Sequence, residues 1–238
     1  MKLDQHFLID EKVVNKIIEV SELKKDDFVL EIGAGKGALT KKLKCKFVAV
    51  EIDKSFKEDL KSFNVIYDDV LKVIDKLEFN KIIGSIPYYI SEPLFKKMLK
   101  LDFELAVLLV GKNFYDVLLD KSSKWNLVCG LFFDVKKILD VPKEAFDPKP
   151  RTESVVLKFK KRDKKLSKEE EIIKEFVLQD DKKVKNALVY SLVRVKGLTK
   201  KEAKDIVYKL VPLNLLEKNV DYLSNKQFIR VVEKIYKK

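Results

Sequence analysis

The sequence of 238 residues predicts an α/β fold in which helices cover both faces of a mostly parallel sheet, followed by a small all-helical domain. From residue 10 to about residue 160, short apolar runs alternate with helical patterns. A glycine-rich segment joins the first of these runs to a helix. After a charged run at 160–165, the pattern becomes purely helical. We therefore expect one domain over residues 1–163 and a second over 164–238.

The first domain is predicted element by element. Asp10 is placed to cap a helix whose apolar residues Val13, Val14 and Ile17 recur at helical spacing. A proline-punctuated connection at 141–150 excludes regular helix and central strand. The expected strands are 28–32, 47–52, 64–67, 81–83 and 105–110, with a terminal antiparallel pair at 127–139 and 154–159. The expected helices are 38–43, 54–62, 92–101 and 113–119, and in the second domain 172–178, 184–195, 200–210 and 226–236.

Positive charge is concentrated in the C-terminal part of the chain. Residues 151–238 contain 24 basic and 13 acidic residues, a net charge of +11, whereas the first 150 residues contain 26 and 25. A basic appendage beside a nearly neutral body favours binding to a polyanion, because each lysine or arginine that faces a phosphate releases a counterion. The alternative is a solvated, lysine-rich surface of a heat-adapted protein.

Several classes of protein are disfavoured. No run of 18 apolar residues occurs, and the N-terminus lacks the features of a signal peptide, so we expect a soluble, cytoplasmic protein with no membrane partner. We also expect a monomer. Cys45 and Cys129 have no metal-binding spacing and His6 is the single histidine, so we expect no metal site.

The strongest local feature is the segment from Glu31 to Gly37, which joins the first strand to a helix. Glycines let the backbone turn sharply and approach a ligand closely, with amide groups directed at it. The same glycines also satisfy the dinucleotide pattern G-x-G-x-x-G/A, so the loop alone leaves a nicotinamide dehydrogenase open. No convincing acid or base for hydride transfer accompanies it.

Two carboxylates follow the next strands. Glu51 ends the second strand, about 20 residues beyond the glycine loop, where a carboxylate can bind the hydroxyls of a ribose. We prefer it to Asp53, because it lies directly at the strand end. Asp69 ends the third run and is suited to accept a hydrogen bond from an adenine amino group. Its neighbour Asp68 is interpreted as a solvated loop carboxylate.

The fourth strand ends in Ser85-Ile86-Pro87-Tyr88, and this turn is the predicted catalytic segment. The exocyclic amine of a nucleobase is a poor nucleophile, because its lone pair is delocalised into the ring. Acceptors directed at its hydrogens favour the geometry needed for attack, and the Ser85 hydroxyl and the Ile86 carbonyl are suited to this role. Pro87 would fix the turn and Tyr88 would stack on the base.

Seven segments of the chain, in order, resemble the motifs of the ribosomal RNA adenine N6-dimethyltransferases of the KsgA type. Together they span nearly the whole sequence. They are 5–8 (Q-H-F-L), 31–37 (E-I-G-A-G-K-G), 51–53 (E-I-D), Asp69, 85–88 (S-I-P-Y), 146–156 and the basic segment 182–188.

This resemblance implies a Rossmann-like, seven-stranded class I methyltransferase sheet with a small all-helical C-terminal domain. It implies S-adenosyl-L-methionine as cofactor and N6-dimethylation of adjacent adenines in a loop near the 3' end of small-subunit (16S) rRNA, on a precursor of that subunit during ribosome biogenesis. The residues implied at the cofactor are Gln5, His6, Leu8, Gly33, Gly35, Gly37, Glu51, Asp69 and Ser85. Those implied at the RNA are Lys182, Lys183 and Lys185.

The chain departs from the family at two of these positions. His6 replaces an asparagine, and Ser85 replaces the asparagine whose amide oxygen accepts from the target amine. Serine is shorter, and its hydroxyl can donate as well as accept. These departures leave open a non-catalytic or weakly catalytic ribosome assembly factor with the same fold. The same motif set also resembles methyltransferases that modify an adenine of large-subunit rRNA, so this alternative stays open as well.

Overall fold

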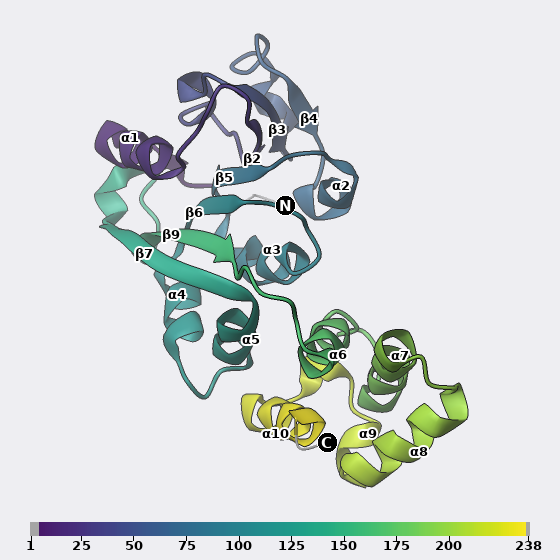
Figure 1. The fold of residues 1–238 in the computed structure, drawn as a ribbon. Helices are drawn as coiled ribbons and strands as arrows, with labels where there is room; N and C mark the ends of the chain where they lie inside the picture. Colours follow the sequence, from purple (N-terminus) through teal and green to yellow (C-terminus); the bar gives the residue numbers. More distant parts are fainter. Residues whose placement is uncertain (1–4, 237–238) are drawn as a thin grey trace. The chain divides into compact units, whose positions relative to one another are not determined.

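The chain forms two compact units, which a computed structural model describes over residues 5–236 (Figure 1). The first unit comprises the chain up to Asp116 together with Phe133–Lys161, and the second comprises Val117–Phe132 together with the chain from Arg162 onward. The expected boundary near residue 163 lies close to the last of these crossings. The expected first domain, however, also contained residues 117–132, which belong to the second unit.

A seven-stranded sheet forms the centre of the first unit. In spatial order it contains β4 (Val65–Tyr67), β3 (Lys46–Glu51), β2 (Phe28–Ile32), β5 (Lys81–Ser85), β6 (Leu105–Gly111), β9 (Ser154–Lys161) and β7 (Phe133–Val141). The first five strands are parallel, and β9 is antiparallel to both of its neighbours. The implied seven-stranded sheet and its terminal antiparallel pairing are confirmed.

Helices cover both faces of this sheet (Figure 1). α1 (Glu11–Val20) begins at Asp10, whose carboxylate accepts hydrogen bonds from the backbone of Lys12 and Val13 at 2.8 and 3.2 Å. Its apolar residues pack against β2, β5 and β6 on one face. On the other face, α3 (Ser91–Met98) places Phe95 with its ring centroid 5.4 Å from that of Phe133. The sheet therefore has the doubly covered core that the sequence predicts.

Short elements complete the first unit. β1 (Phe7–Leu8) pairs with β8 (Phe146–Asp147), which joins the N-terminal segment to the proline-rich connection. α2 (Val70–Val73) follows β4, and α4 (Lys112–Leu119) follows β6. The helices expected at 38–43 and 54–62 are only single 3-10 turns, at Thr40–Lys42 and Lys54–Lys57.

The second unit is entirely helical. Its helices are α5 (Lys124–Phe132), α6 (Lys168–Val177), α7 (Val184–Lys196), α8 (Lys200–Leu210), α9 (Leu213–Leu216) and α10 (Asn225–Tyr236). Serine and threonine capping boxes start α6 and α8, and Gly197, with φ of 67°, ends α7. The interpretation of 127–139 as one strand was wrong in its first half, because α5 occupies residues up to Phe132.

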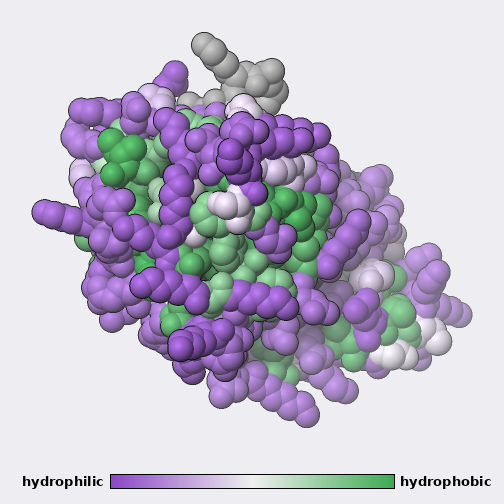
Figure 2. Space-filling view, turned by 90° about the horizontal axis from the view of Figure 1, so that it is seen from above, coloured by the Kyte–Doolittle hydropathy of each residue, from purple (hydrophilic) through white to green (hydrophobic). Residues whose placement is uncertain are grey.

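Hydrophilic side chains dominate the face drawn in Figure 2, although smaller hydrophobic patches remain visible between them. This surface agrees with the charged fraction of 37%. Within residues 5–236, no helix is both long enough and apolar enough to cross a membrane.

Candidate functional site

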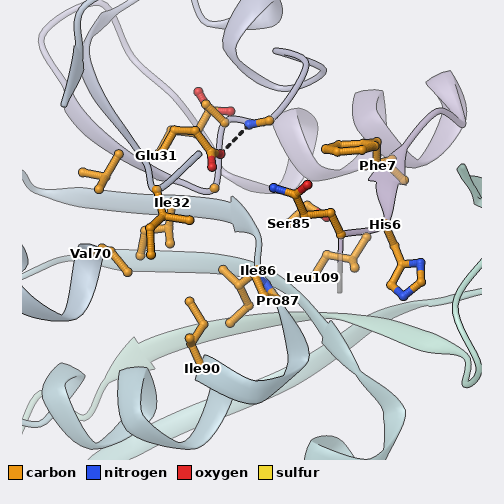
Figure 3. Close-up of a pocket in the computed structure, with 18 of the residues that line it drawn as sticks. His6, Phe7, Glu31, Ile32, Val70, Ser85, Ile86, Pro87, Ile90 and Leu109 are labelled. Carbon is orange, nitrogen blue, oxygen red and sulfur yellow. Dashed lines mark hydrogen bonds between the residues drawn. The ribbon is translucent and has the colours of Figure 1, made fainter. Parts of the chain in front are cut away.

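A cavity of about 360 Å³ opens at the carboxyl ends of the parallel strands (Figure 3). Its walls come from the segments that follow β2, β3, β4 and β5, together with the N-terminal segment around β1. The carboxyl ends of neighbouring parallel strands are where such folds bind their ligands. Of the residues singled out from the sequence, those that line the cavity are Gln5, His6, Leu8, Gly33, Gly35, Glu51, Asp69, Ser85, Ile86, Pro87 and Tyr88.

The glycine loop after β2 approaches its neighbours too closely for side chains. Gly33 and Gly35 have φ values of 74° and 51°, which L-residues rarely adopt. A Cβ atom on Gly33 would lie 3.2 Å from the carbonyl oxygen of Ser85, and one on Gly35 would lie 3.2 Å from the ring of Phe7. The loop therefore offers bare backbone to a ligand in the cavity.

Gly37 does not line the cavity, and its expected place at the cofactor is not supported by the structure. Its amide donates a hydrogen bond to the carbonyl oxygen of Ala34 at 2.8 Å, and its φ is 81°. A Cβ atom there would meet Leu60 and Lys41 at 3.2 Å. The third glycine of the loop thus closes a tight turn on the side away from the cavity.

Glu51 fixes the shape of this loop. The residue is 5% exposed, and its carboxylate accepts hydrogen bonds from the backbone amides of Gly35 and Asp53, both at 2.8 Å. Asp53 in turn accepts from the Gln5 side chain at 2.9 Å. The backbone amide of Ser55, and then Gln5, lower the pKa of Asp53. Glu51 is therefore the carboxylate at the cavity, whereas Asp53 anchors the N-terminal segment.

Asp69 lines the cavity and caps α2. One carboxylate oxygen accepts the amide of Leu71 at 2.9 Å, which leaves the other oxygen available within the cavity lining. Asp68, interpreted as a loop carboxylate, is exposed but also lines the cavity. The surrounding wall is apolar and suits a flat ring; it is made by Ile32, Ile52, Val70, Ile86 and Ile90.

The turn after β5 holds its side chains firmly. Ile86 donates its amide to the carbonyl oxygen of Leu109 at 3.1 Å, and Pro87 starts the 3-10 turn Tyr88–Ile90. The Tyr88 hydroxyl bonds the Ser154 hydroxyl at 2.6 Å. Its ring lies on the backbone of Gly111, where a Cβ atom would approach the ring to 2.9 Å. Ser85, half-buried at the strand end, and this ring are both brought to the cavity.

Glu31 was not among the predicted site residues, although its side chain is the most unusual of those at the cavity. It is 1% exposed, and its Oε2 atom has no hydrogen-bond partner among the described residues. Burial, with a smaller contribution from the charge of Glu51, raises the pKa of Glu31 to about 7. The signal in the sequence is that Glu31 is an acidic residue within the otherwise apolar run of β2.

The three predicted RNA-binding lysines gather at the start of α7 in the helical unit. Lys183 forms an ion pair with Glu217 at 2.8 Å, and Lys185 bonds the other oxygen of the same carboxylate. Lys182 lies 3.7 Å from Asp181. The two lysines lower the pKa of Glu217 to about 2. The three lysines therefore lie close together, and the carboxylate of Glu217 neutralises part of their charge.

The residues at the cavity fit S-adenosylmethionine. Gly33 and Gly35 bring bare backbone to the cavity, Glu51 is suited to the ribose hydroxyls, and Asp69 lies beside an apolar wall suited to adenine. The sheet order and the Ser85-Ile86-Pro87-Tyr88 turn complete the arrangement. These features define a class I S-adenosylmethionine-dependent methyltransferase.

Comparison with known proteins identifies the family. The model of the ribosomal RNA adenine dimethylase family matches residues 1–237, and the chain belongs to this family. A probable ribosomal RNA small subunit methyltransferase A of Methanococcus maripaludis is 35% identical over 88% of this chain and 87% of that protein. The chain is accordingly an enzyme that uses S-adenosylmethionine to methylate adenine in ribosomal RNA.

Two solved structures share the fold. A dimethyladenosine transferase from Plasmodium falciparum is 23% identical, with a TM-score of 0.66 over 98% of each chain. The 23S rRNA methyltransferase ErmE is 22% identical, with a TM-score of 0.61 over 97% of this chain and 99% of that one. The fold implied by the sequence motifs is confirmed over almost the full length.

Proposed function

We propose that this chain dimethylates the N6 amines of adjacent adenines in a loop near the 3' end of small-subunit rRNA, as a step of ribosome biogenesis. One observation carries the proposal: the cofactor-type groups and the Ser85-Ile86-Pro87-Tyr88 turn line the same cavity. The name of the Methanococcus maripaludis relative supports the choice of the small subunit.

Bound S-adenosylmethionine supplies an electrophilic methyl carbon on a positively charged sulfur. The chain's part is to position the adenine amine and to make its lone pair available. Ser85 Oγ and the Ile86 carbonyl oxygen accept hydrogen bonds from the two N6–H groups. These contacts favour the pyramidal nitrogen that is required for attack. Transfer of the methyl group to this nitrogen would be balanced by the loss of one amine proton to solvent. Tyr88, fixed by Ser154 and Gly111, supports the ring of the base.

The other residues at the cavity bind the cofactor. Glu51 binds the ribose through oxygen lone pairs that its two backbone contacts leave available, and Asp69 accepts the adenine amino group of the cofactor. Gln5, His6, Leu8, Gly33 and Gly35 line the rest of this site. The basic residues at the start of α7 contact RNA phosphates. We further propose that the protein is a cytoplasmic monomer that acts on a precursor of the small subunit.

A large-subunit adenine is the second candidate substrate, because the fold is also that of ErmE, a 23S rRNA methyltransferase. The two substrates are separated by incubating the protein with isotopically labelled cofactor and with immature small or large subunits. Mass spectrometry of the recovered rRNA then maps the methyl groups. Adjacent N6-methylated adenines in the small subunit are expected, and label confined to the large subunit would contradict the proposal.

A Ser85→Ala variant tests whether the chain acts as a catalyst or as an assembly factor. The substitution removes one acceptor from the target amine and leaves the glycine loop and Glu51 intact. We expect turnover to fall by about 100-fold or more, as for loss of a transition-state hydrogen bond. The dissociation constant of S-adenosylmethionine, measured by calorimetry, should change little. Equal turnover in variant and wild type would argue against the assigned role of Ser85.

A further inference from the structure

One side of α8 presents basic and aromatic side chains to solvent. Lys201, Lys204 and Tyr208 are spaced at i, i+3 and i+7, so they lie on the same side of the helix. The opposite side of α8 is buried through Ala203 and Val207. The three side chains, called the α8 face below, are all exposed, and Tyr208 keeps 50% of its surface accessible.

The two lysines of the α8 face differ from the basic residues of the neighbouring helix α7, because they have no counterion. Each basic residue of α7 lies near a carboxylate: Lys185 near Glu217, Arg194 near Glu175 at 3.4 Å, and Lys196 near Glu169 at 3.7 Å. Lys201 and Lys204 form no ion pair with any residue between 5 and 236. A phosphate can therefore bind them without displacing a carboxylate.

The acidic residues of α8 leave this charge in place. Glu202 accepts hydrogen bonds from the backbone amide and the hydroxyl of Thr199 at 2.8 and 2.6 Å, so its carboxylate is engaged at the start of the helix. Asp205 is exposed on the same side as Lys201, but within the described chain it forms no ion pair. With four lysines and these two carboxylates, α8 has a net positive charge.

Tyr208 adds a flat ring to the charged face. In the part of the chain that the structure describes, its hydroxyl has no hydrogen-bond partner. Glu217, and to a smaller extent Tyr208, raise the pKa of Lys185, so the ring lies within electrostatic reach of α7. Proteins bind unpaired nucleotides with aromatic rings beside ammonium groups, because every base offers a flat face for stacking while its phosphates meet the cations.

The length of the α8 face suits a short single strand. With a rise of about 1.5 Å per residue, Lys201 and Tyr208 are separated by about 10 Å along the helix axis. This distance corresponds to about three nucleotides at about 3.4 Å each.

We propose that the α8 face binds an unpaired stretch of RNA, with Lys201 and Lys204 on phosphates and Tyr208 stacked on a base. The inference rests on the proposed function, since it names the kind of RNA structure that the helical unit recognises. It adds a second contact surface to the lysines at the start of α7.

Binding measurements without methyl transfer test the role of Tyr208. A fluorescent oligouridine, which is unpaired and contains no adenine, is compared with an RNA duplex of the same length. The full chain is used with S-adenosylhomocysteine present, and dissociation constants come from fluorescence anisotropy. We expect Tyr208→Ala to weaken oligouridine binding by about fivefold or more, and to leave duplex binding within about twofold. Tyr208→Phe keeps the ring and should bind like the wild type, whereas Tyr208→Leu keeps only apolar bulk and should bind like Tyr208→Ala.

The salt dependence of oligouridine binding tests the two lysines. Joint replacement of Lys201 and Lys204 by glutamine should lower the slope of log K against log salt by about 1.4, because each phosphate contact on a single strand contributes about 0.7. Joint replacement of Lys24 and Lys25 by glutamine is the matched control. These two exposed lysines precede β2, at the end of the sheet opposite the cavity, and their loss should leave the slope unchanged.

Four outcomes would each overturn the inference. They are equal weakening of oligouridine and duplex binding by Tyr208→Ala, wild-type binding by Tyr208→Leu, equal salt slopes for the two double variants, and a wild type that does not bind oligouridine. None of them depends on methylation. Small-subunit adenines left unmodified would overturn the proposed function instead, whatever the α8 face binds.

Discussion

Glu31 and Ser85 show how much of this cavity depends on single side chains. Glu31 is a carboxyl group with an unpartnered oxygen in a buried strand, and Ser85 is a short side chain where the family has an asparagine. Burial of a carboxyl group disfavours its charged form, whereas shortening an acceptor weakens a contact made in the transition state. The effect of burying Glu31 is measured as a change in the free energy of unfolding, and the effect of the short Ser85 side chain is measured as a change in turnover.

Replacing Glu31 by glutamine should change how stability depends on pH. The ordinary pKa of this carboxyl is 4.5, and in the folded protein it is raised to about 7. Because the folded state holds the proton more tightly, the stabilisation is full below about pH 4.5 and is lost as the pH rises through 7. The unfolding free energy of Glu31→Gln, relative to wild type, should therefore increase by about 3 kcal/mol between these limits.

Urea unfolding followed by circular dichroism at several pH values measures this difference. Glu58→Gln, on the surface beside Lys61, is the control for removal of one negative charge. A difference between Glu31→Gln and wild type that stays constant with pH would show that the buried group does not titrate in this range.

Ser85→Asn should restore the longer acceptor of the family. The amide oxygen then reaches further toward the target amine, and we expect turnover to rise by up to about tenfold, equivalent to about 1.4 kcal/mol of transition-state stabilisation. The proportion of dimethylated to monomethylated adenine should rise as well, which mass spectrometry of digested rRNA measures. Ser85→Thr, which keeps a hydroxyl, is the matched control. A fall in both quantities for Ser85→Asn would mean that the cavity is built around serine.

At the scale of elements, α7 is unusual because positively charged residues lie at its N-terminus. Lysines occupy its cap and its first turn, where carboxylates are favoured by the helix dipole, and Glu217 compensates for two of them. Exposed ion pairs of this kind contribute little to stability. Their consequence lies in binding, because a phosphate must compete with Glu217 for Lys183 and Lys185.

Neutralising Lys182, Lys183 and Lys185 together should weaken RNA binding and reduce its dependence on salt. Loss of three phosphate contacts lowers the slope of log K against log salt by about 2 to 3. Glu217→Gln should act in the opposite direction, since it releases the two lysines. Anisotropy titrations over a range of KCl concentrations measure both, while the cofactor dissociation constant serves as the control. An unchanged slope in the triple variant would place the RNA contacts elsewhere.

The same scale explains which elements the sequence predicts. α1, α6 and α8 carry side-chain caps and apolar residues at helical spacing, and these local signals locate them well. α5 was mistaken for part of a strand, since an apolar run without polar punctuation has no periodicity to separate the two structures. In the site, strand ends located Glu51, Asp69 and Ser85, but the pattern did not reveal that Gly37 turns away.

At the scale of the whole molecule, the chain passes through the helical unit twice. Residues Val117–Phe132 join it between β6 and β7, and the chain returns to it after β9. Within this unit, the amide of Lys124 in α5 bonds the Asn225 side chain at 3.2 Å, and its ammonium lies 3.6 Å from Asp221. A sequence pattern assigns neighbouring residues to one domain, so this arrangement, which depends on contacts distant in sequence, was not predicted.

A fragment of residues 164–238 should therefore fold poorly. It lacks α5, whose buried Trp125, Val128 and Phe132 belong to the same helical unit as α10. We expect lower helicity per residue and a broad thermal transition by circular dichroism. A fragment in which residues 117–132 are joined through a flexible linker should recover a cooperative transition. Equally sharp melting of both fragments would show that α5 is dispensable.

The split origin of the helical unit also bears on whether this unit can be exchanged between related proteins. A recombination event that exchanged only the C-terminal segment would leave α5 behind, with its apolar face matched to a lost neighbour. Replacement of the C-terminal segment alone would therefore also require matching substitutions in α5.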